Sequence, residues 1–165
     1  MPQLKSRLFA ALGAVVVVGS LAACSPESVL ENALGDGSGV DVDTDDGGVV
    51  ITDDEGNSFT SGGGLPEGFP SDVPVLDLEV LLGGSSSQDG VESFYVTMSG
   101  SGGQDLYDDA LSELESAGYT ADDTSVVQGD DGSFLAWAQL SGPHDVLLSV
   151  SGDASETAIT YTVSN

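Results

Sequence analysis

Residues 133–163 read SFLAWAQLSGPHDVLLSVSGDASETAITYTV, and apolar and polar side chains alternate in three runs along this stretch. A period of two is typical of a β-strand that buries one of its faces. The predicted strands are Ser133 to Leu140, Val146 to Ser151 and Thr157 to Val163. Their separators, Ser141 to His144 and Gly152-Asp153, are rich in turn-forming residues. Because such short turns join antiparallel neighbours, the stretch predicts an antiparallel sheet.

Three further strands are predicted upstream of this stretch. Tyr119 to Val127 and Phe94 to Met98 are rich in β-forming residues, and the second run alternates with a period of two. Val75 to Leu82 predicts another strand, and the polar run from Gly83 to Gly90 predicts a loop after it. Prolines at 66, 70 and 74 predict an extended, turn-rich entry, because proline fixes φ and disfavours helix before it.

One helix of about 14 residues is predicted after the break at Gly100 to Gly103. Its apolar stripe comprises Leu106, Ala110, Leu111, Leu114 and Ala117. Asp105 suits the positive N-terminal end and Gly118 the C′ position. The order is therefore ββαββββ, which predicts an α+β domain over residues 65–165. We expect an antiparallel sheet of about five to six strands with one helix packed on one face.

The two faces of this predicted sheet differ in composition. The face toward the helix would collect Phe94, Val96, Met98, Phe134, Ala136, Ala138, Leu140, Val146, Leu148, Val150, Ile159, Tyr161 and Val163. The other face would show Tyr95, Leu135, Trp137, Gln139, Leu147, Thr160 and Thr162. A single helix covers one face, so Tyr95, Leu135, Trp137 and Leu147 predict an exposed apolar surface for a partner protein, a glycan or a small apolar ligand. Alternatively, an acidic hairpin upstream folds back and covers this face with Ile51 and Phe59.

The charge of the chain excludes several classes of function. The sequence has 28 Asp and Glu against 2 Lys and Arg, for a net charge of −26. Both cations, Lys5 and Arg7, precede the first acid, Glu27. Nucleic-acid binding needs cations along a phosphate backbone, so no nucleic-acid partner is expected. The chain beyond Arg7 has no Lys or Arg. This excludes a phosphate-binding loop with its lysine, a Schiff-base lysine and an arginine finger.

Residues 1–23 have the organisation of a secretory signal. Lys5 and Arg7 form a positive start, and Leu8 to Val18 is an apolar run too short to span a bilayer. The run is followed by Leu21-Ala22-Ala23-Cys24, which resembles the lipobox of bacterial lipoproteins, and Cys24 is the only cysteine. The resemblance implies a lipid on the Cys24 thiol and cleavage before it. It predicts a lipid-anchored protein of the cell membrane, exposed on the extracytoplasmic side; an ordinary signal peptide or an uncleaved anchor are the alternatives.

Residues 24–64 predict an acidic, Gly-rich tether between this cysteine and the domain. Within it, two β-forming runs flank Asp53-Asp54-Glu55-Gly56-Asn57. The pattern predicts a β-hairpin at 48–61.

The tether also holds the one sequence that resembles a metal-binding loop. Asp41-Val42-Asp43-Thr44-Asp45-Asp46-Gly47 is similar to the start of an EF-hand calcium loop, and Asp41, Asp43, Asp45 and Asp46 are the candidate Ca²⁺ ligands. The run departs from that motif because its glycine falls one place late and Thr52 stands where the loop has glutamate. A solvated acidic linker is the alternative.

Candidate catalytic residues are few. His144 is the only histidine, and the chain has no Gly-x-Ser-x-Gly motif to supply a nucleophile for a Ser-His-Asp triad. We expect His144 to be an exposed turn residue. Asp123-Thr124-Ser125 faintly resembles the Asp-Thr-Gly or Asp-Thr-Ser of aspartic proteases, whose chemistry needs a second carboxylate. No catalytic residue is therefore predicted, and we expect that the protein is not an enzyme.

The stretch Gly63-Gly64-Leu65-Pro66-Glu67-Gly68-Phe69-Pro70-Ser71-Asp72-Val73-Pro74 resembles the domain entry of small acidic lipoproteins of high-GC Gram-positive bacteria. Tyr95-Val96-Thr97, the helix from Asp108 to Gly118 and Tyr161-Thr162-Val163 fit the same resemblance. It implies location and fold and supplies no activity.

The function predicted from the sequence is a membrane-anchored, non-catalytic module that binds a partner protein or a cell-wall glycan. A calcium- or divalent-cation-dependent surface module and a small hydrolase are the alternatives.

Overall fold

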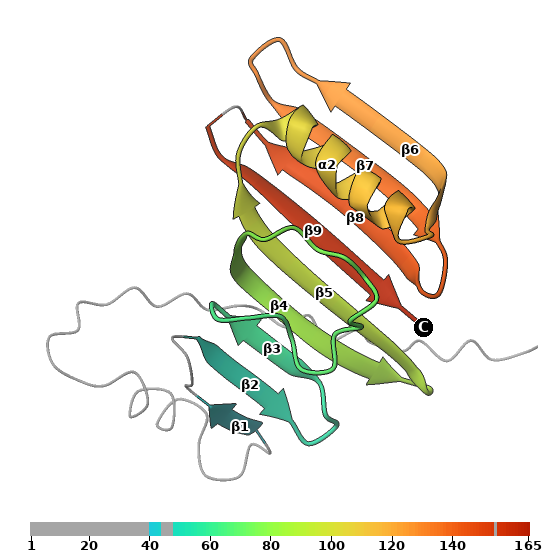
Figure 1. Cartoon of the computed structure of the whole chain (residues 1–165). Coiled ribbons are helices and arrows are strands. Elements are labelled where there is room, and N and C mark those ends of the chain that lie inside the picture. The colour runs from blue at the N-terminus through green and yellow to red at the C-terminus, as the bar shows by residue number, and fades with distance from the viewer. Residues whose placement is uncertain (1–39, 44–47, 154) are drawn as a thin grey trace, which may run out of the picture.

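The computed structural model describes residues 40–43, 48–153 and 155–165. Its strands form one nine-stranded sheet in the order β1-β2-β3-β4-β5-β9-β8-β7-β6, and every neighbouring pair is antiparallel (Figure 1). The strands are β1 (Val40–Asp43), β2 (Val49–Asp53), β3 (Ser58–Ser61), β4 (Glu79–Gln88), β5 (Val91–Gly100), β6 (Thr120–Gln128), β7 (Phe134–Ser141), β8 (Asp145–Gly152) and β9 (Thr157–Ser164). The described helix is α2 (Gly103–Ser116).

The prediction of an antiparallel sheet with one helix is confirmed at this level, but its strand number and order are wrong. Five strands precede α2 and four follow it, so the order is not ββαββββ. The difference of three strands arises because β2 and β3, which form the hairpin at 48–61, pair onto the edge of β4 and β1 pairs onto β2. Backbone pairing at a free edge needs no particular side-chain pattern, and the sequence therefore does not reveal it.

The predicted loop from Gly83 to Gly90 is also wrong, because β4 continues through its glycines and serines to Gln88. The turn consists of Asp89 and Gly90, which both have positive φ, 55° and 84°. Two successive positive φ values are what a two-residue hairpin turn requires. The polar residues of β4 resemble a loop in composition, yet their backbone pairs with β5 along the whole strand.

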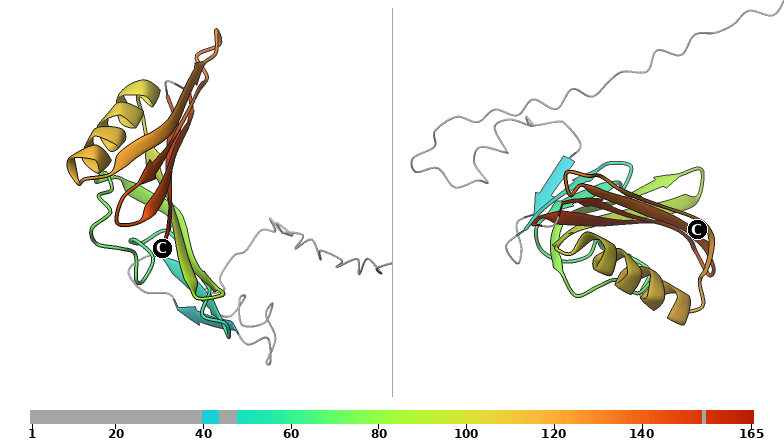
Figure 2. Two further views of the ribbon diagram at one scale, coloured as in Figure 1. Left: turned by 90° about the vertical axis from the view of Figure 1, so that its right-hand side faces the viewer. Right: turned by 90° about the horizontal axis from the view of Figure 1, so that it is seen from above.

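β4 begins at Glu79, later than the predicted Val75, because the preceding residues pack on the sheet instead of joining it. Val73 is buried there, and Phe69, Val75, Leu76 and Leu78 pack against the core. Phe69 meets Phe94 of β5 edge-on, with ring centroids 6.0 Å apart. Residues 65–77 thus cover one part of the sheet and α2 another, and both lie on the same side of it (Figure 2).

Helix α2 has the 14 residues expected and ends in a Schellman motif. The Tyr119 N–H donates to the Leu114 carbonyl at 3.1 Å and the Gly118 N–H donates to the Glu115 carbonyl at 3.0 Å, so Gly118 is at C′ as predicted. The buried stripe includes Tyr107, which the prediction missed, whereas Ala117 is exposed. The Tyr107 hydroxyl donates to the Trp137 carbonyl at 3.3 Å and ties α2 to β7.

The core lies between the sheet and these two covering segments. All thirteen side chains predicted for the helix-facing side of the sheet are buried. We call this side the covered face and the opposite side the open face. The alternative in which the acidic hairpin folds back over the open face is wrong. The hairpin of β2 and β3 instead pairs with β4 at the sheet edge, and its Ile51 and Phe59 enlarge the open face.

Candidate functional site

Strand register places the four predicted surface residues on the open face. Leu147 pairs with Gln139 on one side and Thr162 on the other, and Thr162 pairs with Tyr95. Trp137 pairs with Ser149 in the next row. Because side chains alternate along a strand, the neighbours of Leu147 on β8 point to the other side, and both Val146 and Leu148 are buried. The sequence prediction therefore assigned each of these side chains to the correct face.

Three of these residues, together with one that the prediction omitted, form an apolar surface on β6, β7 and β8. We call Val127, Leu135, Trp137 and Leu147 the apolar patch. Leu147 is 44 % exposed, Leu135 48 % and Val127 56 %. Trp137 is half-buried. Val127 lies directly opposite Leu135, Trp137 is two residues from Leu135 on the same face of β7, and Leu147 is a diagonal neighbour of Trp137, so each side chain is within reach of the next.

Tyr95 belongs to a second cluster farther along the open face. It lies opposite Gly84, and Phe59 lies on the other side of the same glycine. A Cβ on Gly84 would stand 2.7 Å from Tyr95 Cε1, so the Tyr95 ring can pack there because residue 84 has no side chain. Burial raises the pKa of the Tyr95 phenol.

A polar strip separates the two clusters. Thr97 and Thr160 hydrogen-bond through their hydroxyls at 2.9 Å, and Thr162 stands between Tyr95 and Leu147. Tyr95 is thus two strands away from Leu147, about 10 Å at the usual strand spacing. The structure does not bring Tyr95 into the apolar patch.

Carboxylates border the apolar patch on the side of β6. Asp123 pairs in register with Gln139, which itself lies next to Leu147. Both Asp122 and Asp123 are exposed. Since the sequence has no Lys or Arg after Arg7, no described residue other than His144 can give these carboxylates a cationic partner. The apolar patch is therefore flanked by uncompensated negative charge.

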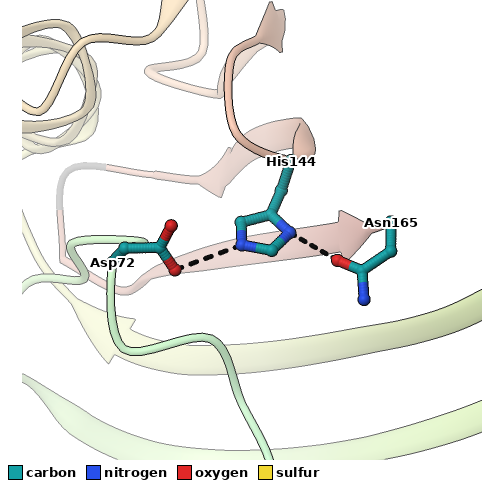
Figure 3. Close-up of polar contacts among 3 residues, drawn as sticks. All are labelled: Asp72, His144 and Asn165. Carbon is teal, nitrogen blue, oxygen red and sulfur yellow. Dashed lines mark hydrogen bonds and ion pairs between the residues drawn. The ribbon is translucent and has the colours of Figure 1, made fainter.

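His144 has a structural environment that the sequence did not predict. Its side chain is only 18 % exposed, which corrects the expectation of an exposed turn residue. Nε2 lies 3.1 Å from Asp72 Oδ1, and Nδ1 contacts the side-chain oxygen of Asn165 (Figure 3). The ring thus joins three segments that are distant in sequence: the covering segment, the turn between β7 and β8, and the end of β9. Both ring nitrogens are engaged, and no serine hydroxyl from the described part of the chain is among their contacts.

The described residues also form cavities away from the apolar patch. One of about 370 Å³ is at the start of α2, lined by Gly102, Gly103 and Phe134 among others. The other, of about 260 Å³, lies where the β2–β3 hairpin meets β4 and is lined mainly by Ser and Thr together with Glu67 and Glu92. Neither is lined by His144, Asp123 or the apolar patch, so the hydrolase alternative gains no cleft from them.

The remaining predicted site residues lie partly outside the described structure. Asp41 and Asp43 are in β1, where they pair in register with Thr52 and Val50. Asp45, Asp46 and Cys24 lie outside the described residues. Within the described ranges, no group of three or more His, Cys, Asp or Glu side chains is arranged to hold a metal ion. Calcium binding by the tether and lipidation of Cys24 both stay predictions.

Comparison with known proteins adds no relative from which a function could be carried over. Among the described residues, no helix has the length and apolar character needed to cross a bilayer. The chain matches no known family model, no curated protein and no solved structure.

Proposed function

We propose that this protein is an extracytoplasmic lipoprotein, anchored to the cell membrane through Cys24, which binds another protein of the cell envelope with the open face of its sheet. The signal features and the lipobox-like Leu21-Ala22-Ala23-Cys24 support the anchor. The observation that carries the binding role is the apolar patch, in which three aliphatic side chains are about half exposed on an ordered sheet.

The exposure of these side chains has a physical cost that binding would remove. Removal of apolar surface from water is favourable by about 25 cal/mol of free energy for each Å². Scattered apolar residues on a surface are ordinary, but Val127, Leu135, Trp137 and Leu147 are neighbours on three adjacent strands. A contiguous surface on a sheet whose strands are paired suits docking, because its backbone is already ordered before a partner binds.

The chemistry of the apolar patch favours a protein partner over a glycan. Three of its four members are aliphatic, and Trp137 is half-buried. A glycan presents hydroxyl groups that need hydrogen-bond partners, and the aliphatic members supply none. Another protein can supply apolar side chains that fill the space around Leu135 and Leu147.

The anchor is tested by the single substitution Cys24→Ser. We expect the wild-type chain to incorporate labelled palmitate and to sediment with membranes, and the variant to do neither, because serine offers no thiol for thioether formation. Membrane association that persists in the variant without label would contradict the lipid anchor.

The binding role is tested by placing a photo-crosslinking amino acid at position 147 of the chain in intact cells. We expect a discrete crosslinked protein from position 147 and none from position 91. Val91 is the matched control, because it is 45 % exposed and lies on the β4–β5 hairpin away from the apolar patch. Crosslinks that fail at position 147, or that appear equally at position 91, would contradict the proposal.

A further inference from the structure

Strand β6 lies at one edge of the sheet, at the opposite end from β1 (Figure 1). β7 pairs with its inner side, and none of the described strands pairs with its outer side. In an antiparallel edge strand, alternate residues direct their N–H and C=O groups outward. Along nine residues this leaves a row of backbone donors and acceptors that another strand could pair with.

The side chains of β6 divide this edge into two parts. Asp122 and Asp123 lie at a β-bulge near its start, where the register shifts between Ala121 and Asp123. Val126 and Val127 follow, 44 % and 56 % exposed, and they point to opposite faces of the sheet. The edge thus presents charge at one end and apolar surface at the other. Val127 belongs to the apolar patch, so the apolar end of the edge is continuous with that patch.

We propose that the outer edge of β6 binds an extended segment of the partner protein as an added antiparallel strand. In this arrangement Lys or Arg side chains of the partner lie opposite Asp122 and Asp123, and apolar side chains lie beside Val126 and Val127. Backbone hydrogen bonds give such a strand its affinity, and alternate side chains give it specificity. The inference rests on the proposed function, because the same partner would cover the apolar patch.

Charge selects this occupant over two others. A second copy of the chain would bring two edges of the same sign together, each on a molecule with 28 acids and no Lys or Arg beyond Arg7. A segment of the chain itself from beyond Arg7 contains no Lys or Arg to place against Asp122 and Asp123. A cationic strand from another protein satisfies both the carboxylates and the free backbone groups. The bulge and the acids that prevent self-pairing therefore also make the edge selective.

The test uses a capped nine-residue peptide with Val in its N-terminal half and Lys in its C-terminal half, so that an antiparallel strand sets Lys opposite Asp122 and Asp123. It uses the full chain as the cell processes it, in a neutral detergent. A control peptide of the same sequence carries a methyl group on every backbone nitrogen and cannot donate strand hydrogen bonds. Binding is measured by fluorescence anisotropy, and the site by amide hydrogen exchange. We expect the first peptide to slow exchange in residues 120–128 and the methylated peptide to bind at least about tenfold more weakly.

Charge reversal then tests selectivity. The double variant Asp122→Lys with Asp123→Lys is expected to weaken peptide binding by about tenfold or more, because like charges then face each other. The matched control, Asp109→Lys with Glu115→Lys, makes the same charge change on the exposed side of α2 and should weaken it far less. An equal loss in both variants would show that only net charge matters and would overturn the proposal.

The hydrogen-exchange measurement keeps the test independent of whether the variants fold. Peptide binding without protection of residues 120–128, or equal binding of the methylated peptide, would overturn strand addition. Protection of the same residues in the protein alone, at concentrations where it forms dimers, would assign the edge to a second copy instead. If position 147 crosslinks to a partner while β6 gains no protection, the strand-addition inference fails and the proposed function stands.

Discussion

Leu147 and Leu148 are neighbours in β8, yet they belong to different environments. Leu148 lies on the covered face and is fully buried, whereas Leu147 lies on the open face and keeps 44 % of its surface exposed. The two side chains have the same chemistry, the same backbone conformation and the same strand pairing on either side. The layer that covers one face of the sheet therefore decides which of two chemically identical leucines is buried in the core and which stays exposed to solvent.

Truncation of Leu148 should destabilise the fold far more than truncation of Leu147. Leu148→Ala should lower the free energy of unfolding by about 2–5 kcal/mol, because it leaves a cavity in a packed core. Leu147→Ala should change it by about 0.5 kcal/mol or less, as at other surface positions. Urea unfolding of the two variants measures both values. Equal losses would mean that Leu147 is already covered and that the open face is not open.

A second prediction concerns a position where the open face is tightly packed. Gly84→Ala should lower the free energy of unfolding by about 1–3 kcal/mol, because the new methyl group would collide with Tyr95 and with the Ser58 carbonyl. Gly64→Ala is the control, since a Cβ there meets nothing within 4 Å. Hydrogen exchange in residues 49–61 should also rise in the first variant, because the collision separates β3 from β4. Unchanged hydrogen exchange in residues 49–61 would contradict the prediction that close packing at Gly84 keeps β3 paired with β4.

Salt should stabilise the whole fold, because the carboxylates of the described residues lie at the surface and not in the core. The buried polar side chains of the described core are Thr60 and Thr157, and none of the buried residues is charged. The carboxylates therefore lie outside the core, where mutual repulsion opposes folding and is screened over about 8–10 Å at ordinary ionic strength. We expect Tm to rise as NaCl increases from about 10 mM to about 1 M.

The same titration distinguishes screening from calcium binding. Calcium chloride at matched ionic strength should raise Tm no more than sodium chloride does if screening is the cause. A larger rise with calcium would point to specific sites, and Asp41, Asp43, Asp45 and Asp46 would be the first residues to substitute. A Tm that stays flat in both salts would contradict the repulsion argument itself.

A smaller effect is expected from acidification of the turns that connect the strands. Hydrogen bonds from the Ser155 hydroxyl at 2.6 Å and from the Ser155 amide at 2.8 Å hold the pKa of Asp153 below its usual 3.8. A depressed pKa contributes stability that is complete above the unfolded-state pKa and is lost as the pH falls through the folded-state pKa. Asp153→Asn cannot titrate, so the Tm difference between it and the wild type should shrink between about pH 5 and about pH 2. A Tm difference that grows as the pH falls would contradict a lowered pKa of Asp153 in the folded state.

The smallest expected effect concerns Tyr119, whose buried hydroxyl has no hydrogen-bond partner among the described residues. Burial, and then the charge of Asp72, raise the pKa of this phenol. Tyr119→Phe should leave the free energy of unfolding unchanged or raise it by up to about 1 kcal/mol, because no hydrogen bond is lost. Tyr107→Phe is the contrast: it removes the bond to Trp137 and should cost about 1 kcal/mol. Equal losses in the two variants would mean that Tyr119 has a partner after all.

The covered face could be predicted from the sequence because its side chains alternate. Phe134 to Leu140 and the two strands after it show a period of two, and every side chain assigned to the core is buried. The helix was equally predictable, since its apolar stripe and Gly118 follow local rules. Tyr107 was missed because a tyrosine with its polar hydroxyl was not counted as part of the apolar stripe, although its ring is buried.

The remaining features depend on tertiary contacts that no local pattern encodes. β4 was predicted as a loop after Leu82 because serine and glycine are common in loops, although their backbones pair as well as any other. The attachment of β2 and β3, and the contacts of His144 with Asp72 and Asn165, join residues far apart in the chain. Trp137, Leu135 and Leu147 could be predicted on one face, but Val127 could not, because its strand has a bulge and weak alternation.

Trp137, the only tryptophan in the chain, offers a direct test of whether the open face binds a partner. Incorporation of 5-fluorotryptophan gives one ¹⁹F resonance from the apolar patch, to be recorded with and without an isolated cell-envelope fraction. We predict that the resonance shifts and broadens on addition of the envelope, and that Leu147→Asp abolishes the change while Val91→Asp preserves it. A resonance that stays unchanged while the chain sediments with the envelope would contradict binding through the open face, because binding would then occur elsewhere.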